Sequence, residues 1–158
     1  MGQNPGAAIG SIAPNFSLKD GDNQSWNLAD HRGKVVVLIF YPADETPVCT
    51  RQLCAVRDRW EDYTETGAEV VGISANTVES HKSFAENHDL PLSLLSDPNL
   101  EVAKMYSAMS AIPGKMGRAV VVIDKQGRVS YRKLRPLIGL VIKPRDDETI
   151  AAIKAASA

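Results

Sequence analysis

The chain has 158 residues, of which 44% are apolar, so we expect one domain around a single core. Eighteen Lys and Arg nearly balance nineteen Asp and Glu, and only 6% of the residues are aromatic, so neither nucleic acid nor a membrane surface is an expected partner. No run approaches the ~18 consecutive apolar residues that a membrane-spanning helix needs.

The first ten residues are small and rich in glycine, and we expect them to be a loose lead-in to one domain over residues 1–158. They lack the charged and apolar regions of a signal peptide, so we expect a cytoplasmic chain. In that compartment, two cysteines indicate redox or metal chemistry rather than structural disulfides. Residues 16–18 and 25–28 flank a turn-rich segment, which predicts a short hairpin, and His31 in the next turn is expected to be solvated.

The apolar run over residues 35–40 is typical of a strand buried on both faces of a parallel sheet. After it, we expect one helix over residues 46–65, with Thr46 as its N-cap and Pro47 as its first residue. This places Cys49 in the first turn, where unpaired N–H groups and the helix dipole favour an anion. A thiol there should ionise more readily than a free one, and the thiolate is the reactive form.

Cys49 and Cys54 are the only cysteines and lie five residues apart. In an intact helix this spacing separates their Cα atoms by roughly 8 to 9 Å, whereas disulfides rarely tolerate more than ~7 Å. A bond between the two sulfurs would require the first helical turns to unwind, which suits a catalytic cycle better than a permanent crosslink. The alternative is that both thiols are buried as small apolar side chains.

The apolar side chains of this helix recur at intervals of four and three residues and predict one buried stripe. The stripe consists of Cys49, Leu53, Val56, Trp60 and Tyr63. Cys54 falls off the stripe, so its thiol is expected on a flank of the helix. The charged residues form a solvated face, from which Arg57 or Asp58 could anchor the helix through an ion pair.

A second apolar strand over residues 69–74 predicts a strand-helix-strand crossover with parallel strands, whose loops reach one edge of the sheet. Thr77 can cap the next helix, over residues 78–87. His81 and His88 lie on this helix, and we expect two exposed histidines rather than a zinc site, because no third ligand is evident.

The remaining chain alternates short elements with loops. We expect an edge strand over 92–95, a helix over 97–106, an antiparallel hairpin of 119–124 with 128–134, and a terminal helix over 146–157 with Ile150 and Ile153 turned inward. The loop before the hairpin contains Met105, Met109 and Met116, which fill gaps in packing or line an apolar rim near the site. Periodicity alone therefore supports a single α/β sheet domain.

The residues around Cys49 resemble the active-site motif of a known family. Pro42-x-x-x-Thr46-x-x-Cys49 is similar to the peroxiredoxin motif, and the further cysteine at 54 is similar to the bacterioferritin-comigratory-protein (peroxiredoxin Q) subfamily. The resemblance covers most of the chain, from residues 13–16 to 122–124. It implies a thioredoxin-like α/β fold with the N-terminal extension of peroxiredoxins and a central mixed sheet flanked by helices.

The resemblance also implies roles for five residues of an atypical 2-Cys peroxiredoxin, an antioxidant thiol peroxidase without metal or cofactor. Cys49 would attack hydrogen peroxide or an organic hydroperoxide and become a sulfenic acid. Cys54 would resolve it to an intramolecular disulfide, which thioredoxin or a similar dithiol protein reduces, so a monomer suffices. Thr46 and Arg118 would contact the sulfur and the peroxide, and Pro42 would limit water. Without the resemblance, Arg118 is interpreted as a surface ion-pair residue.

Three positions depart from the pattern of the family. Val48 stands where Gly is common, Ala119 where Thr is usual and Asn76 where Asp is often found; none is a reacting group. Two other functions remain open. One is a thiol-disulfide oxidoreductase, since Ile112-Pro113 is similar to the proline turn of thioredoxins, although such enzymes use Cys-x-x-Cys. The other is a binding module, either a redox sensor or a holdase chaperone, whose cysteines signal without turning over.

Overall fold

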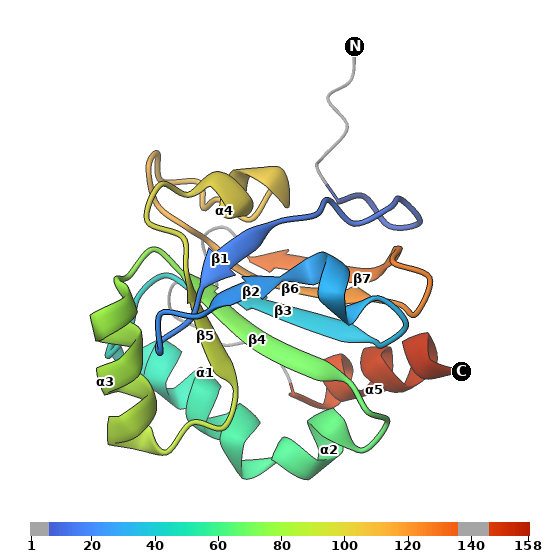
Figure 1. Cartoon of the computed structure of the whole chain (residues 1–158), viewed down its shortest axis with the longest axis horizontal. Coiled ribbons are helices and arrows are strands. Elements are labelled where there is room, and N and C mark those ends of the chain that lie inside the picture. Colours follow the sequence, from blue (N-terminus) through green and yellow to red (C-terminus); the bar gives the residue numbers. More distant parts are fainter. Residues whose placement is uncertain (1–6, 136–145) are drawn as a thin grey trace.

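The computed structural model describes residues 7–135 and 146–158, which form one sheet with helices on both faces (Figure 1). The strands are β1 Ser17–Lys19, β2 Ser25–Asn27, β3 Val36–Phe40, β4 Glu69–Ser74, β5 Ser93–Ser96, β6 Arg118–Ile123 and β7 Val129–Arg135. The helices are the 3₁₀-helix η1 Leu28–His31 and the α-helices α1 Pro47–Asp58, α2 Trp60–Thr64, α3 Val78–His88, α4 Glu101–Met105 and α5 Asp146–Ser157. Within the described residues, the strand order is β2-β1-β5-β4-β3-β6-β7.

Strand β3 lies between β4, to which it is parallel, and β6, to which it is antiparallel. All five of its residues are buried. Val36, Leu38 and Phe40 belong to one apolar cluster, whereas Val37 and Ile39 belong to a second cluster on the opposite face. The predicted strand, buried on both faces, is therefore confirmed.

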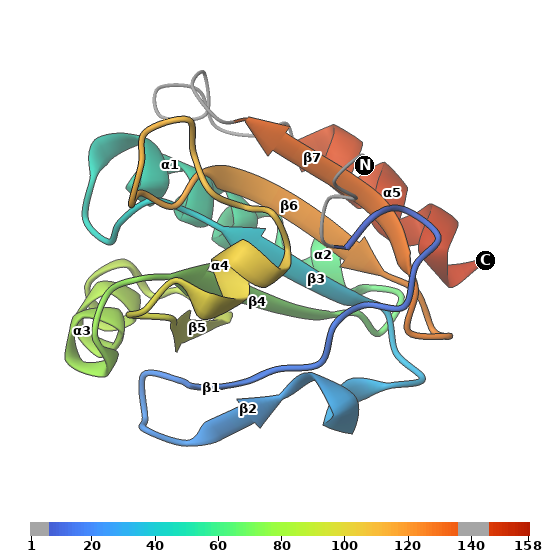
Figure 2. The same cartoon turned by 90° about the horizontal axis from the view of Figure 1, so that it is seen from above.

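The two apolar clusters correspond to two layers of helices. The cluster that contains Leu38 also includes side chains of β1, β2 and α4. The cluster that contains Ile39 includes side chains of α1, α2, α3 and α5. Figures 1 and 2 show α4 on one side of the sheet and α1, α2 and α5 on the other. Helix α1 thus packs against the face of the sheet that carries Val37 and Ile39 of β3, the strand that precedes it in the chain.

Strands β3, β4 and β5 are parallel to one another, so their carboxyl ends meet at one edge of the sheet. The loops that leave these ends lead to α1, α3 and α4, respectively. The predicted crossover from the first parallel strand to the second is confirmed. This edge brings the residues before α1 next to the first turn of α3, as open α/β sheets commonly do at their binding sites.

The expected single helix over residues 46–65 is wrong, because the chain bends at Arg59 between α1 and α2. Arg59 leaves helical geometry, with φ −114° and ψ 28°, and its N–H is shared between the carbonyls of Ala55 and Val56. Its guanidinium bonds Asp62 and also pairs with Asp147 at the start of α5. The bend therefore coincides with ion pairs from Arg59 to both α2 and α5.

The bend changes the predicted stripe only at its end. Cys49, Leu53 and Val56 are buried as predicted, and so is Tyr63, whose hydroxyl donates to Oδ1 of Asp146 over 2.6 Å. Burial and this hydrogen bond raise the pKa of Tyr63 well above its usual value. Trp60 is only partly buried, so its predicted place in the core is wrong.

Two further elements differ from the prediction: β5 in its position in the sheet, and α4 in its first residue. Strand β5 is not an edge strand, because Lys19 of β1 pairs with Ser96 and extends the sheet beyond it. Helix α4 begins at Glu101 rather than at residue 97, since the buried side chain of Asp97 accepts hydrogen bonds from the first helical amides and caps α4 from outside it.

Several local predictions are confirmed. β1 and β2 form the expected hairpin, β6 and β7 form the second hairpin, and α5 turns Ile150 and Ile153 into the core. His31 differs from expectation, because its ring is partly buried and stacks on Trp26 with centroids 4.5 Å apart. Residues 1–6 of the expected lead-in lie outside the described residues.

Three methionines expected in the loop before β6 pack on the α4 side of the sheet, although Met105 is the last residue of α4 itself. Met116 is buried there, and Met105 and Met109 are partly buried against the same cluster. Cys49 belongs to the other cluster. These contacts favour the gap-filling interpretation over an apolar rim.

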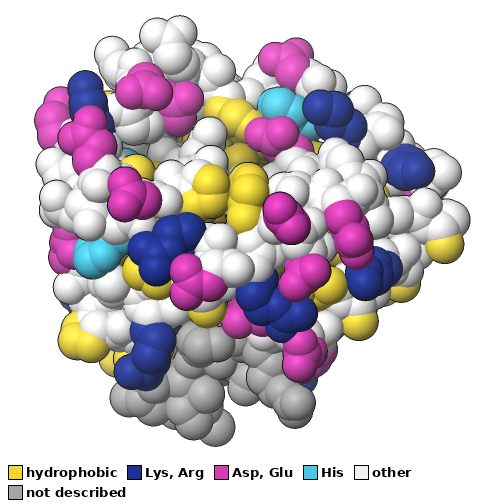
Figure 3. Space-filling view, turned by 90° about the horizontal axis from the view of Figure 1, so that it is seen from below, with side chains coloured by type: hydrophobic (Ala, Val, Ile, Leu, Met, Phe, Trp, Pro, Cys, Tyr) yellow, Lys and Arg dark blue, Asp and Glu magenta, His cyan; other side chains and the backbone are white. Residues whose placement is uncertain are grey.

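The surface over α1, α2 and α5 carries interspersed acidic and basic side chains (Figure 3). Ion pairs link these helices, including Arg59 with Asp147 and Lys154 with Glu65. Among the described residues, no helix has both the length and the apolar character required to cross a membrane.

Replacing Ile153 with alanine tests the packing of α5 against the sheet. Ile153 is fully buried in the cluster of Val37 and Ile39, so truncation should lower the free energy of unfolding by about 2–5 kcal/mol. Urea denaturation measures the change. Ile9→Ala is the control, because Ile9 is 65% exposed and surface changes usually stay within about 0.5 kcal/mol. Equal stabilities of the two variants would contradict the docking of α5.

Candidate active site

Cys49 lies in the first turn of α1, in the segment that follows β3. Thr46 is the N-cap residue, with an extended backbone at φ −79° and ψ 151°, and Pro47 begins the helix, as predicted. Cys49 is buried, with 1% of its surface exposed. The sulfur thus lies near the positive end of the helix and is shielded from water.

Arg118 reaches Cys49 from the first residue of β6. Because Ala119 pairs with Phe40, Arg118 lies beside the end of β3 from which the chain turns into α1. Its Nη2 donates a hydrogen bond to Cys49 Sγ over 3.2 Å. Arg118 is 1% exposed, so its interpretation as a surface residue is wrong. The contact places a permanent positive charge within hydrogen-bonding distance of the sulfur.

Gln52 is a site residue that the sequence reasoning missed. It is 3% exposed, and its Oε1 accepts a hydrogen bond from Nη1 of Arg118. Gln52 and Cys49 are three residues apart on one helix and therefore share a face, which was the available signal. One guanidinium thus contacts both residues. Gln52 fixes the direction of Arg118 without adding a negative charge that would compete with the sulfur.

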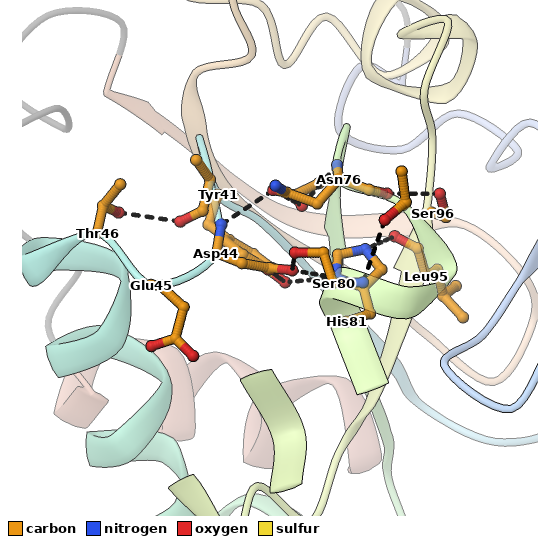
Figure 4. A network of polar contacts seen from close by, with 12 residues as sticks. Tyr41, Asp44, Glu45, Thr46, Asn76, Ser80, His81, Leu95 and Ser96 are labelled. Atoms are coloured by element: carbon orange, nitrogen blue, oxygen red, sulfur yellow. Dashed lines mark hydrogen bonds and ion pairs between the residues drawn. The ribbon is translucent and has the colours of Figure 1, made fainter. Parts of the chain in front are cut away.

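The hydroxyl of Thr46 is held within the loop before α1. It makes no capping hydrogen bond to the helix and instead donates to the carbonyl oxygen of Ala43 over 2.9 Å (Figure 4). With the proton engaged in this way, the Thr46 oxygen keeps its lone pairs as acceptors. The hydroxyl is therefore oriented as an acceptor close to the first turn of α1.

Cys54 is partly buried on the flank of α1 and packs against the cluster that contains Cys49. Both thiols are free. Helix α1 is continuous from Pro47 to Asp58, so an intact helix keeps the two Cα atoms roughly 8 to 9 Å apart. The structure therefore brings Cys49 together with Arg118 and Gln52, but it does not bring Cys49 together with Cys54.

His81 is buried, which contradicts its expected exposure. Its ring is fully inaccessible, with Nδ1 2.8 Å from Oδ2 of Asp44 and Nε2 2.9 Å from the carbonyl oxygen of Leu95. The hydroxyl of Tyr41 donates to the other oxygen of Asp44 over 2.7 Å. Burial first, and then the charge of Asp44, raise the pKa of Tyr41 well above its usual value. Figure 4 shows this network between the start of the loop and α3.

The second histidine of α3 has a different environment. His88 is partly exposed and its Nε2 lies 2.9 Å from Oε1 of Glu45. Its backbone carbonyl accepts a hydrogen bond of 2.6 Å from Arg57, which attaches the end of α1 to the end of α3. Arg57 also bonds Asp58, so the predicted anchoring of the helix combines an ion pair with this longer-range contact. In residues 7–135 and 146–158, no three His, Cys, Asp or Glu side chains group as metal ligands would.

The three residues that depart from the family pattern have distinct environments. Oδ1 of Asn76 accepts from the backbone N–H of Asp44, so Asn76 supports the loop before α1. Val48 is partly buried beside Cys49 in the chain, and Ala119 is buried opposite Phe40. Pro42 begins the same loop and is partly buried, and its shielding of the sulfur stays a prediction.

Comparison with known proteins supports the resemblance. The model of the AhpC/TSA family matches residues 9–132. Peroxiredoxin Q of wheat (Triticum aestivum), named chloroplastic, is 50% identical over 123 residues, which are 77% of this chain and 57% of that protein. Peroxiredoxin Q of Arabidopsis thaliana, also named chloroplastic, is 42% identical over 93% of this chain and 67% of that protein. The chain thus spans little more than half the length of the wheat relative.

A solved structure agrees with these relatives. Peroxidoxin BcpB from Mycobacterium tuberculosis superposes with a TM-score of 0.82 at 29% identity, over 96% of this chain and 98% of that one. This agreement confirms the predicted thioredoxin-like fold with a mixed sheet flanked by helices.

The expected cytoplasmic location is contradicted by the curated relatives. Those from wheat, Sedum lineare and Arabidopsis are all named chloroplastic, so these relatives are assigned to the plastid and not to the cytosol. Composition and the absence of a signal-peptide pattern carried no information that distinguishes the two compartments. The extent of the family match, together with the identities of 42–50%, establishes that the chain belongs to the AhpC/TSA family, within its peroxiredoxin Q (bacterioferritin-comigratory-protein) group.

Proposed function

We propose that the chain is a thiol peroxidase in which Cys49 reduces hydrogen peroxide or an organic hydroperoxide. The observation that carries this proposal is the 3.2 Å hydrogen bond from Arg118 to a sulfur that is 1% exposed in the first turn of α1. The Cys49 thiolate attacks the terminal peroxide oxygen and the O–O bond breaks. The sulfur becomes a sulfenic acid, while the other oxygen takes a proton and leaves as water or an alcohol.

The surrounding groups match the needs of this step. Oγ1 of Thr46, whose proton is donated to Ala43, accepts a hydrogen bond from the hydroperoxide. The Arg118 guanidinium stabilises the negative charge as it passes from sulfur to the leaving oxygen. Pro42 limits water at the same place. Each of these roles is a proposal supported by the residue's position in the loop before α1 or at the start of β6.

Recycling needs Cys54 to reach the oxidised sulfur. The Cys54 thiol attacks Sγ of the Cys49 sulfenic acid, a disulfide forms and water leaves. Because the two residues lie on one continuous helix, this step requires α1 to unwind locally. Thioredoxin or a similar dithiol protein then reduces the disulfide by exchange. Since both cysteines belong to one chain, a single thioredoxin-like domain acting as a monomer is sufficient.

The burial of Cys49 favours this function over a thiol-disulfide reductase. A reductase must present its nucleophilic sulfur to the disulfide of another protein, but Cys49 is 1% exposed. Hydrogen peroxide is far smaller than a protein substrate and needs a much narrower opening. The Cys49 to Cys54 spacing also differs from the Cys-x-x-Cys pattern of such reductases.

Two cysteine variants test the proposed cycle. With thioredoxin, its reductase and NADPH, wild type should consume peroxide continuously, whereas Cys49→Ser should show no turnover because the nucleophile is missing. Cys54→Ser should react once and then accumulate a Cys49 sulfenic acid, which dimedone traps for mass spectrometry. Full activity of Cys49→Ser would contradict the assigned nucleophile. An unchanged coupled rate in Cys54→Ser would show that Cys54 does not resolve.

A Gln52→Leu variant tests the orientation of Arg118. Leucine fills a similar volume but removes the acceptor for Nη1, so the guanidinium loses this contact while Nη2 still faces Cys49. The rate constant for oxidation of Cys49 by peroxide, measured by rapid quench, should fall by about tenfold because charge stabilisation depends on donor position. Gln126→Leu is the matched control, since Gln126 is exposed on the β6–β7 turn. Equal rates in the two variants would contradict the role of Gln52.

A further inference from the structure

A buried contact between Asp44 and His81 joins the loop before α1 to the first turn of α3. The side chain of Asp44 is 1% exposed and that of His81 is fully buried, and their Oδ2 and Nδ1 atoms are 2.8 Å apart. Oδ2 also accepts from the hydroxyl of Ser80, and Oδ1 accepts from the hydroxyl of Tyr41, each over 2.7 Å. The backbone N–H of Asp44 donates to Asn76. The carboxylate is therefore held by Tyr41, which directly follows β3, and by Ser80 and His81 of α3, while Asn76 holds the backbone of Asp44.

The hydrogen bonds of His81 indicate how its two ring nitrogens are used in this network. The carbonyl oxygen of Leu95 can only accept, so Nε2 of His81 carries a proton. Nδ1 lies 2.8 Å from Oδ2 of Asp44, so one proton is shared between these two atoms. Both groups are buried, where a polar group without a hydrogen-bond partner is strongly unfavourable. Neither partner can be removed without leaving the other unsatisfied.

This pair lies one residue from the acceptor that orients Thr46. Asp44 follows Ala43, whose carbonyl oxygen accepts the Thr46 hydroxyl over 2.9 Å. Between Asp44 and Thr46, Glu45 has φ +62°, a left-handed conformation that side-chain-bearing residues rarely adopt. The loop therefore needs external contacts to keep its path. Figure 4 shows Asp44 directed at α3 while Thr46 points back into the loop.

The loop has a second contact with α3, but it is exposed. Hydrogen bonds from Asn87 and then His88 lower the pKa of Glu45, whose side chain is 47% exposed. Exposed pairs of this kind contribute little, because water and salt screen them. Of these contacts between the loop and α3, the buried one between Asp44 and His81 is therefore the stronger.

We propose that Asp44 and His81 are positioning residues of the peroxide reaction. By holding the loop against α3, they keep the Ala43 carbonyl in place, and the Ala43 carbonyl directs the Thr46 oxygen toward the hydroperoxide. This role rests on the proposed peroxidase function. It requires no contact of either residue with the peroxide or with the sulfur of Cys49.

The test compares two reactions of the same sulfur. Iodoacetamide alkylates a thiolate without needing the Thr46 acceptor, whereas the peroxide reaction needs it. Asp44→Asn and His81→Gln should slow oxidation of Cys49 by roughly tenfold to a hundredfold and change the alkylation rate by less than about twofold. His88→Gln is the matched control on the same helix and should leave both rates within about twofold.

A double variant shows whether the effect passes through Thr46. Thr46→Val alone should also slow oxidation, and Asp44→Asn combined with Thr46→Val should be no slower than Thr46→Val alone, because both changes remove one interaction. Independent, multiplying effects would overturn the positioning role. A parallel fall of oxidation and alkylation would overturn it too, since that result indicates general disruption of α1.

A third, milder variant keeps the proposal testable if Asp44→Asn or His81→Gln fails to fold. Ser80→Ala removes one hydrogen bond to Asp44 and leaves the Asp44–His81 contact in place, so it should slow oxidation less, again without changing alkylation. Wild-type protein that is alkylated but not oxidised would overturn the proposed function, and the positioning role with it. Normal oxidation in wild type and in all the Asp44, His81 and Ser80 variants would overturn only the positioning role.

Discussion

The hydrogen bond between Arg118 and Cys49 is the contact on which the site depends. It joins the start of β6 to the start of α1, two places 69 residues apart in the chain. Sheet pairing makes it possible, because β6 lies directly beside β3 and the chain passes from β3 into α1. Gln52, on the following turn of α1, receives the other arm of the guanidinium. A folded α1 is therefore needed for the guanidinium to contact both Cys49 and Gln52.

Much of this arrangement could be predicted from local sequence patterns. A continuous apolar run identified β3, and Thr46 with Pro47 marked the beginning of α1, so the place of Cys49 followed from capping chemistry. These features depend on neighbouring residues and survive folding unchanged. Arg118 is different, since only its resemblance to a family motif placed it at the site; its sequence surroundings favoured the surface.

The features that could not be predicted depend on contacts between distant segments. Asp44 meets His81 across 37 residues, and nothing in the sequence of α3 distinguishes a buried histidine from an exposed one. The bend at Arg59 coincides with its ion pair to Asp147, 88 residues away. In both cases the tertiary partner decides the outcome, whereas periodicity alone favoured an exposed ring and an unbroken helix.

The proposed cycle requires the same helix to be folded when Cys49 reacts with peroxide and unfolded when Cys49 joins Cys54, and hydrogen exchange tests this requirement most directly. Amides of α1 around residues 49–54 should be protected in the reduced protein and exchange faster after one equivalent of peroxide, as the mass falls by two hydrogens. Cys54→Ser, treated in the same way, should retain its protection. Formation of the disulfide with unchanged exchange in α1 would contradict the account, because the bond would then form without unwinding the helix.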